Sequence, residues 1–79
     1  MNNEDNSKFV KGLQIALKKE RATRRTYMAL AKREPNEARR KALIGLAEVE
    51  AGHAERWTQR LKELGAEVPP DRETLRERI

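Results

Sequence analysis

The chain of 79 residues contains no cysteine, which limits the ways in which so small a protein can be stabilised. Disulfides, thiolate zinc sites and a rubredoxin-type iron centre are all excluded. Only 37% of the residues are hydrophobic and 39% are charged, so a single copy buries only a thin core. Small domains of this kind depend on disulfides, metals or self-association. With disulfides excluded, a metal site and oligomerisation remain.

The sequence also lacks any apolar run near the roughly 20 residues that a membrane-spanning helix requires, and no signal-peptide pattern opens it. We therefore expect a soluble, cytoplasmic protein. The net charge is +5, from 18 Lys+Arg and 13 Asp+Glu. Basic residues interleave with Glu20, Glu34 and Glu37, as on the solvated face of a helix. We therefore expect no nucleic-acid partner. Strand signals, internal repeats and low-complexity tracts are absent as well.

The first half of the sequence is typical of one long helix. Residues 1–6 are polar and are expected to be disordered. Asp5, Asn6 and Ser7 are plausible N-caps. No proline follows until Pro35, so we expect a first helix over about residues 7–33.

A break at residues 34–36 (Glu-Pro-Asn) separates this helix from a second one. The residue before a proline is disfavoured in the α region, whereas proline itself fits the first turn of a new helix. The second helix is expected over about residues 36–64, with Gly65 as its C-cap glycine. Residues 66–79 then form a linker and a short C-terminal helix that Asp71 caps. The predicted fold is all-α, with an antiparallel hairpin over residues 7–65 as its single domain.

The only histidine, His53, stands in a Glu50-x-x-His53 pattern that places both side chains on one helical face. Glu20 lies 15 residues before Pro35 and Glu50 lies 15 after it. Because both helices have the same rise per residue, the two glutamates are expected at the same height of the hairpin. The sequence thus predicts that Glu20, Glu50 and His53 converge.

These three residues lie on the stripes that should be buried. On helix 2, Glu50 and His53 lie within a stripe whose steps are three or four residues. Its apolar members are Leu43, Leu46, Trp57, Leu61 and Leu64. Glu20 lies on the corresponding stripe of helix 1: Phe9, Leu13, Ala16, Leu17, Thr23, Tyr27, Leu30 and Ala31. Buried charges are normally paired or bound to metals. Tyr27 is two turns beyond Glu20, where its hydroxyl would hydrogen-bond a ligand carboxylate or its ring would fill the core. Both interpretations of Tyr27 stay open.

Three ligands do not complete a typical metal site, and two helices do not close a core. Both requirements are met if two hairpins pair into a four-helix bundle. The pair then supplies a Glu from each of two helices and a Glu-x-x-His from each of the other two, the ligand set of di-iron carboxylate bundles. Carboxylate and imidazole ligands suit iron or manganese.

The chain resembles half of a ferritin-like protein over residues 8–65, on the strength of Glu20, Tyr27, Glu50 and His53. A single half of this kind looks like the encapsulated-ferritin family, whose two-helix chains build a di-iron site at a dimer interface. The resemblance implies a ferroxidase that oxidises Fe(II) with oxygen for iron storage or detoxification. Glu20 and Glu50 would be ligands or bridges, His53 a terminal ligand and Tyr27 an accessory residue. It also implies a homodimer or larger homo-oligomer, and an encapsulin-type shell as a possible partner or compartment.

The sequence departs from that family at several positions. Lys19 and Ala22 replace acidic residues that some members carry beside the helix-1 glutamate, and residues 73–79 do not resemble an encapsulation tail. The basic charge and the Pro-Pro linker resemble instead the rubrerythrin-like domain of some membrane iron transporters. That alternative implies iron sensing or delivery, with Arg72 to Arg78 at the cytoplasmic membrane face. A third possibility is a helical interaction or nucleic-acid-binding module without a metal. The choice between iron and manganese and the size of the oligomer also stay open.

Overall fold

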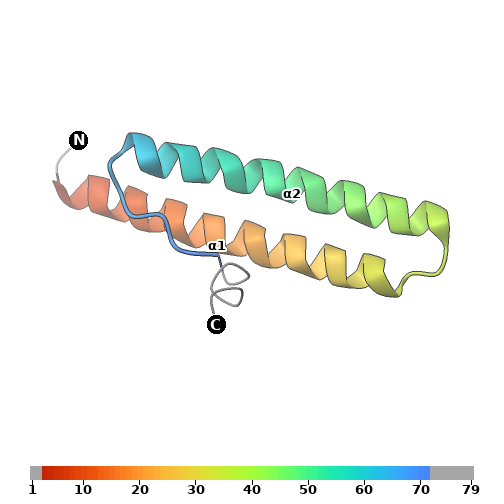
Figure 1. Cartoon of the computed structure of the whole chain (residues 1–79). Coiled ribbons are helices and arrows are strands. Elements are labelled where there is room, and N and C mark those ends of the chain that lie inside the picture. Colours follow the sequence, from red (N-terminus) through yellow and green to blue (C-terminus); the bar gives the residue numbers. More distant parts are fainter. Residues whose placement is uncertain (1–2, 72–79) are drawn as a thin grey trace.

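The computed structural model describes residues 3–71, which form two long antiparallel helices joined by a short turn (Figure 1). Helix α1 spans Asn3–Arg33 and helix α2 spans Glu37–Glu63. The two helices pack against each other along their length. This confirms the predicted all-α hairpin. Within the described range, neither helix is long and apolar enough to cross a membrane.

The start of α1 differs from the prediction. The helix begins at Asn3 and not near Ser7, so residues 3–6 are helical and the expected disordered segment 1–6 is wrong over those four positions. Extending an existing helix by one residue costs far less than nucleating one, and neither proline nor glycine occurs before Gly12. The candidate N-caps Asp5, Asn6 and Ser7 all lie inside the helix, so the presence of capping residues did not predict where the helix begins.

The turn between the helices is held by polar groups of its own residues. Asn36 has an extended backbone (φ −77°, ψ 121°), and its side-chain oxygen accepts a hydrogen bond from the Arg39 backbone N–H. The Asn36 N–H in turn donates to a Glu34 carboxylate oxygen at 3.2 Å. Asn36 is therefore the N-cap of α2. The break falls where the sequence predicts it, but Pro35 lies before the cap and not in the first turn of the helix. The short, capped turn fixes the register of one helix against the other.

Helix α2 ends where the sequence predicts. Leu64 is the C-cap, and Gly65 follows with a φ of +67°, a conformation that favours glycine. The Gly65 N–H donates to the Lys62 carbonyl at 3.0 Å, and the Ala66 N–H donates to the Leu61 carbonyl at 2.9 Å. These two bonds make a Schellman motif. The chain leaves the helix here and reverses direction.

Large buried side chains are concentrated at the end of the hairpin away from the turn. Leu17 and Leu61 are fully buried there and Leu13 nearly so. Six partly buried residues pack around them: Val10, Ala54, Trp57, Leu64, Ala66 and Val68. Nearer the turn only two small residues are buried, Ala31 and Ala47. Leu30 and Leu46, which the predicted stripes include, are about half exposed.

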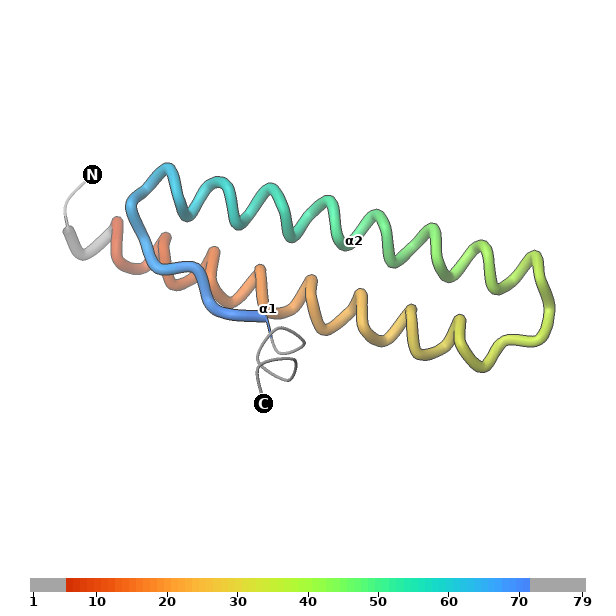
Figure 2. The backbone as a smooth tube through the Cα atoms, in the orientation of Figure 1, coloured from red at the N-terminus to blue at the C-terminus, as the bar shows by residue number. Residues whose placement is uncertain are grey.

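Residues 66–71, which we call the strap, fold back along α1 (Figure 2). The Gln14 amide donates to the Glu67 carbonyl at 2.9 Å, and Arg21 Nη1 donates to the Pro69 carbonyl at 2.6 Å. Asp71 forms ion pairs with Arg21 at 3.7 Å and with Arg25 at 3.6 Å. The predicted linker is thus a packed element of the fold. The short C-terminal helix predicted after Asp71 lies outside the described residues.

Candidate metal centre

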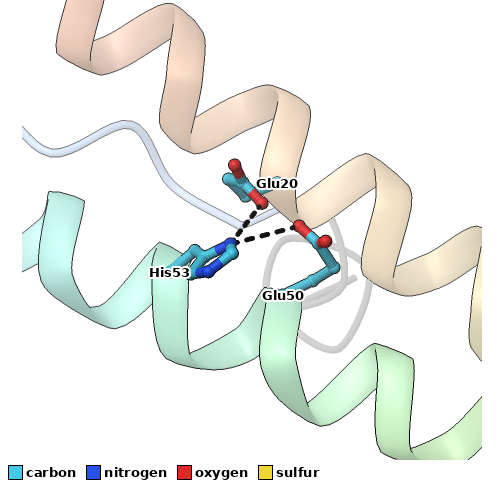
Figure 3. Close-up of side chains that lie close together, drawn as sticks. All are labelled: Glu20, Glu50 and His53. Atoms are coloured by element: carbon cyan, nitrogen blue, oxygen red, sulfur yellow. Dashed lines mark hydrogen bonds and ion pairs between the residues drawn. The ribbon is translucent and has the colours of Figure 1, made fainter.

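The three predicted ligands meet between α1 and α2 (Figure 3). His53 Nδ1 lies 3.3 Å from Glu20 Oε2 and 3.7 Å from Glu50 Oε2. One ligand atom from each residue can be chosen so that all three lie within 4.8 Å of one another. The predicted convergence of Glu20, Glu50 and His53 is confirmed. Within residues 3–71, no fourth acidic or histidine residue joins this group.

Two features of the fold bring these side chains together. The capped turn at Asn36 sets the register, so that Glu20 and Glu50 lie at matched heights on antiparallel helices. Within α2, the separation of three places Glu50 and His53 on one face, one turn apart. The buried residues Leu17, on α1, and Ala47, on α2, each stand one turn from a glutamate of the group and hold the helices in contact. The ligands are therefore carried by two rigid helices and not by loops.

The group is only partly shielded from solvent. The Glu20 and Glu50 side chains are 25% and 20% exposed, and that of His53 is 44% exposed. The Nδ1 atom of His53 lies within hydrogen-bonding distance of Glu20 Oε2. An ionised carboxylate can only accept hydrogen bonds, so this bond forms only in the tautomer that carries the proton on Nδ1. Two carboxylates and one imidazole give the group a negative charge even when His53 is protonated. A divalent cation bound by Nδ1 would require the imidazole proton to be on Nε2, and its two charges would neutralise the two carboxylates.

Two of the three separations between donor atoms are close to those around one transition-metal ion. With metal–ligand bonds of about 2.1 Å, neighbouring ligand atoms lie about 3 to 3.5 Å apart around the ion. The distances of 3.3 and 3.7 Å from His53 Nδ1 to the two carboxylates are close to this separation. Two oxygen donors, one imidazole and no thiolate suit iron, manganese or zinc more than softer ions. Small side-chain rotations would complete a three-ligand face.

Neither Tyr27 nor Trp57 forms a hydrogen bond with the polar atoms of the group within residues 3–71. Tyr27 is partly buried on α1, and no hydrogen bond joins its hydroxyl to Glu20, Glu50 or His53 in the described structure. Its role as an accessory residue stays a prediction. Trp57 lies one turn beyond His53 and packs against the leucine cluster. Its indole N–H is buried without a hydrogen-bond partner among the described residues.

Comparisons of the chain with family models, with curated proteins and with solved structures find no match. The assignment of the site therefore depends on its own geometry. Sequence reasoning found its three ligands but missed the contacts of the strap with Arg21 and Arg25. The only available signal was the spacing of four between the two arginines, together with Asp71 after a Pro-Pro pair.

Proposed function

We propose that this chain is a ferroxidase that oxidises Fe(II) to Fe(III) with dioxygen, at a site completed by a second copy of the chain. The observation that supports it best is the group formed by Glu20, Glu50 and His53, with one ligand atom of each within 4.8 Å of the others. Iron is the substrate here, and the reaction serves iron storage or detoxification. The ligand set, duplicated by the pairing, is that of di-iron carboxylate bundles.

A second copy is needed because one chain surrounds only part of an ion. Three ligand atoms from two helices occupy one side of the metal, and His53 is nearly half exposed. When two such groups face each other, the pair offers four carboxylates and two imidazoles to two irons. The paired site is also drier than the open one, which strengthens the binding of cations by carboxylates.

Exposed apolar side chains favour one face of the hairpin for this pairing. Leu46, Val49 and His53 follow one another on α2 at steps of three and four, and the two apolar residues are 46% and 53% exposed. On α1, the exposed residues Phe9 and Leu30 lie on the side away from Arg21, where the strap binds. We assign the second copy to the face with these four apolar residues, which a monomer would leave in water.

The three side chains have separate roles in this proposal. Glu20 and Glu50 supply negative charge, which favours Fe(III) over Fe(II) because the interaction grows with the charge of the ion. His53 is a neutral ligand that binds through Nδ1 with its proton on Nε2. Each Fe(II) gives one electron to dioxygen, and holding two irons together allows the acceptor to take two electrons in one encounter.

The test is the rate of Fe(II) oxidation in air, followed by the absorbance of Fe(III). We expect Glu20→Gln and His53→Ala to lower the rate at least tenfold relative to the unaltered chain. Glu48→Gln is the matched control, because Glu48 is an exposed glutamate of α2 outside the group. Equal rates in all four proteins would contradict the proposal. Metal binding without oxidation would also contradict it and would favour an iron-sensing or delivery domain.

A further inference from the structure

A second site of concentrated charge lies on the side of α1 that faces the strap. Lys18, Arg21 and Arg25 follow one another at steps of three and four, so their side chains leave the same side of the helix. Together with Pro70 they line a hollow of about 330 Å³ between α1 and the strap. This hollow contains none of the residues of the candidate metal centre.

The two arginines are held in place and not free in solvent. The Arg21 side chain is 14% exposed, donates to the Pro69 carbonyl and pairs with the Asp71 carboxylate. The Arg25 side chain is 25% exposed and pairs with the other Asp71 oxygen. Asp71 thus occupies both guanidinium groups as a carboxylate ligand supplied by the chain itself.

The charges lining the hollow do not cancel. Lys18 forms no ion pair within residues 3–71, so three cations face one carboxylate, which leaves two positive charges. Glu67 lines the neighbouring hollow with Lys18 but is not paired with it. A ligand with two negative charges would neutralise this excess, whereas a chloride ion or a carboxylate would neutralise half of it.

The strap gives the hollow a fixed wall. Ala66 and Val68 pack against the leucine cluster, and the Glu67 carbonyl accepts a hydrogen bond from Gln14. Pro69 and Pro70 restrict the backbone that follows, because the proline ring fixes φ. The site therefore exists before a ligand arrives, so little ordering is required on binding.

We propose that this hollow binds a dianionic oxyanion of the phosphate type, held by Lys18, Arg21 and Arg25. The fork of donors on a guanidinium group matches two oxygens of a phosphate, and the Lys18 ammonium supplies a point charge. Asp71 and the ligand compete for the same two guanidinium groups. The Asp71 carboxylate thus lowers the affinity of the site for the ligand, and removal of its charge raises that affinity. This inference is independent of the proposed oxidation of iron.

The experiment is an amide NMR titration of the metal-free, full-length chain with inorganic phosphate. It is done at about pH 8, where the ion is mostly dianionic, with sodium chloride to keep the ionic strength constant. We expect saturable shifts confined to residues 17–26 and 66–71. Lys18→Ala should weaken binding about tenfold, and Asp71→Asn should tighten it about tenfold. Lys32→Ala, a lysine on the same side of α1 but away from the strap, should leave it unchanged.

Several results would overturn the inference. Shifts that do not saturate, or that chloride reproduces, would show only general attraction to a basic protein. If Lys18→Ala and Lys32→Ala lowered the affinity for phosphate equally, binding would again reflect only the general positive charge of the protein. If a duplex DNA displaced phosphate and bound much more tightly than phosphate, the natural ligand of this face would be a polymer and not a free ion. Because no metal is present, each of these results leaves the oxidation of iron to be judged separately.

Discussion

The two ends of the hairpin are stabilised in different ways. Away from the turn, Leu13, Leu17 and Leu61 form a cluster that the strap covers. Near the turn, the helices meet through the small residues Ala31 and Ala47, and larger apolar side chains point outwards. The chain therefore buries its large apolar side chains at one end and leaves those near the turn exposed, where we propose that a second copy packs.

The candidate ligands lie between these two ends. Leu17, one turn before Glu20 on α1, belongs to the closed end, whereas Ala47, one turn before Glu50 on α2, belongs to the open end. The closed end can thus hold the ligands at the correct height, and the exposed residues Leu46 and Val49 beside them remain available for pairing. A rigid closed end and an exposed apolar face both suit the site that we propose two copies share.

The largest expected effect on stability is at the closed end. Leu17→Ala removes a fully buried side chain and should lower the free energy of unfolding by about 3 kcal/mol. Ile15→Ala, at an exposed position of the same helix, should change it by less than about 0.5 kcal/mol. Urea unfolding followed by circular dichroism, at one protein concentration, measures both. Similar losses in the two variants would show that the leucine cluster is not the core.

The next effect concerns the open end and depends on protein concentration. Leu46→Glu places a charge on the proposed pairing face and should raise the dimer dissociation constant about 30-fold, equivalent to about 2 kcal/mol. Ile15→Glu, which introduces the same charge at an exposed position outside the proposed face, is the matched control. Analytical ultracentrifugation over a dilution series gives both constants. A dimer that survives Leu46→Glu would place the interface elsewhere.

A smaller loss is expected when the strap is detached. Arg21→Ala removes the hydrogen bond to Pro69 and the ion pair with Asp71, and should cost about 1 to 2 kcal/mol. Lys19→Ala, an exposed neighbour on α1, should cost much less. Hydrogen exchange of the backbone amides in residues 66–68 provides a local measurement. Unchanged protection there after Arg21→Ala would mean that the strap is held by Val68 and the leucine cluster alone.

The smallest effects have opposite signs at two glycines. Gly65→Ala forces a side chain into a positive-φ conformation and should destabilise the chain by about 1 kcal/mol. Gly52→Ala, inside α2 with no atom within 4 Å of the new Cβ, should stabilise it by about 0.5 to 1 kcal/mol. Thermal unfolding of the two variants compares them directly. A stabilising Gly65→Ala would contradict the Schellman end of α2.

The features that the sequence predicted correctly are those that depend on local rules. The break at Pro35 and the glycine at position 65 follow from backbone preferences. The meeting of Glu20 with Glu50 follows from the equal rise of two helices about one turn. Each of these inferences needs only neighbouring residues or a simple count along the chain.

The features that were missed depend on contacts between distant residues. The Arg21 hydrogen bond to Pro69 spans 48 positions, and nothing in the Pro-Pro stretch shows which helix it will contact. The predicted apolar stripes were also wider than one partner helix can cover, which is why Leu30 and Leu46 are exposed. A stripe pattern does not separate residues buried within one chain from residues available for another.

The central claim is that Glu20, Glu50 and His53 of two chains hold iron together. Native mass spectrometry of the chain loaded with Fe(II) without oxygen tests it most directly. The account predicts a dimer with two irons, the loss of that iron in His53→Ala, and its retention in Glu48→Gln. A monomer without iron, or iron that binds equally well to the His53→Ala variant, would contradict it.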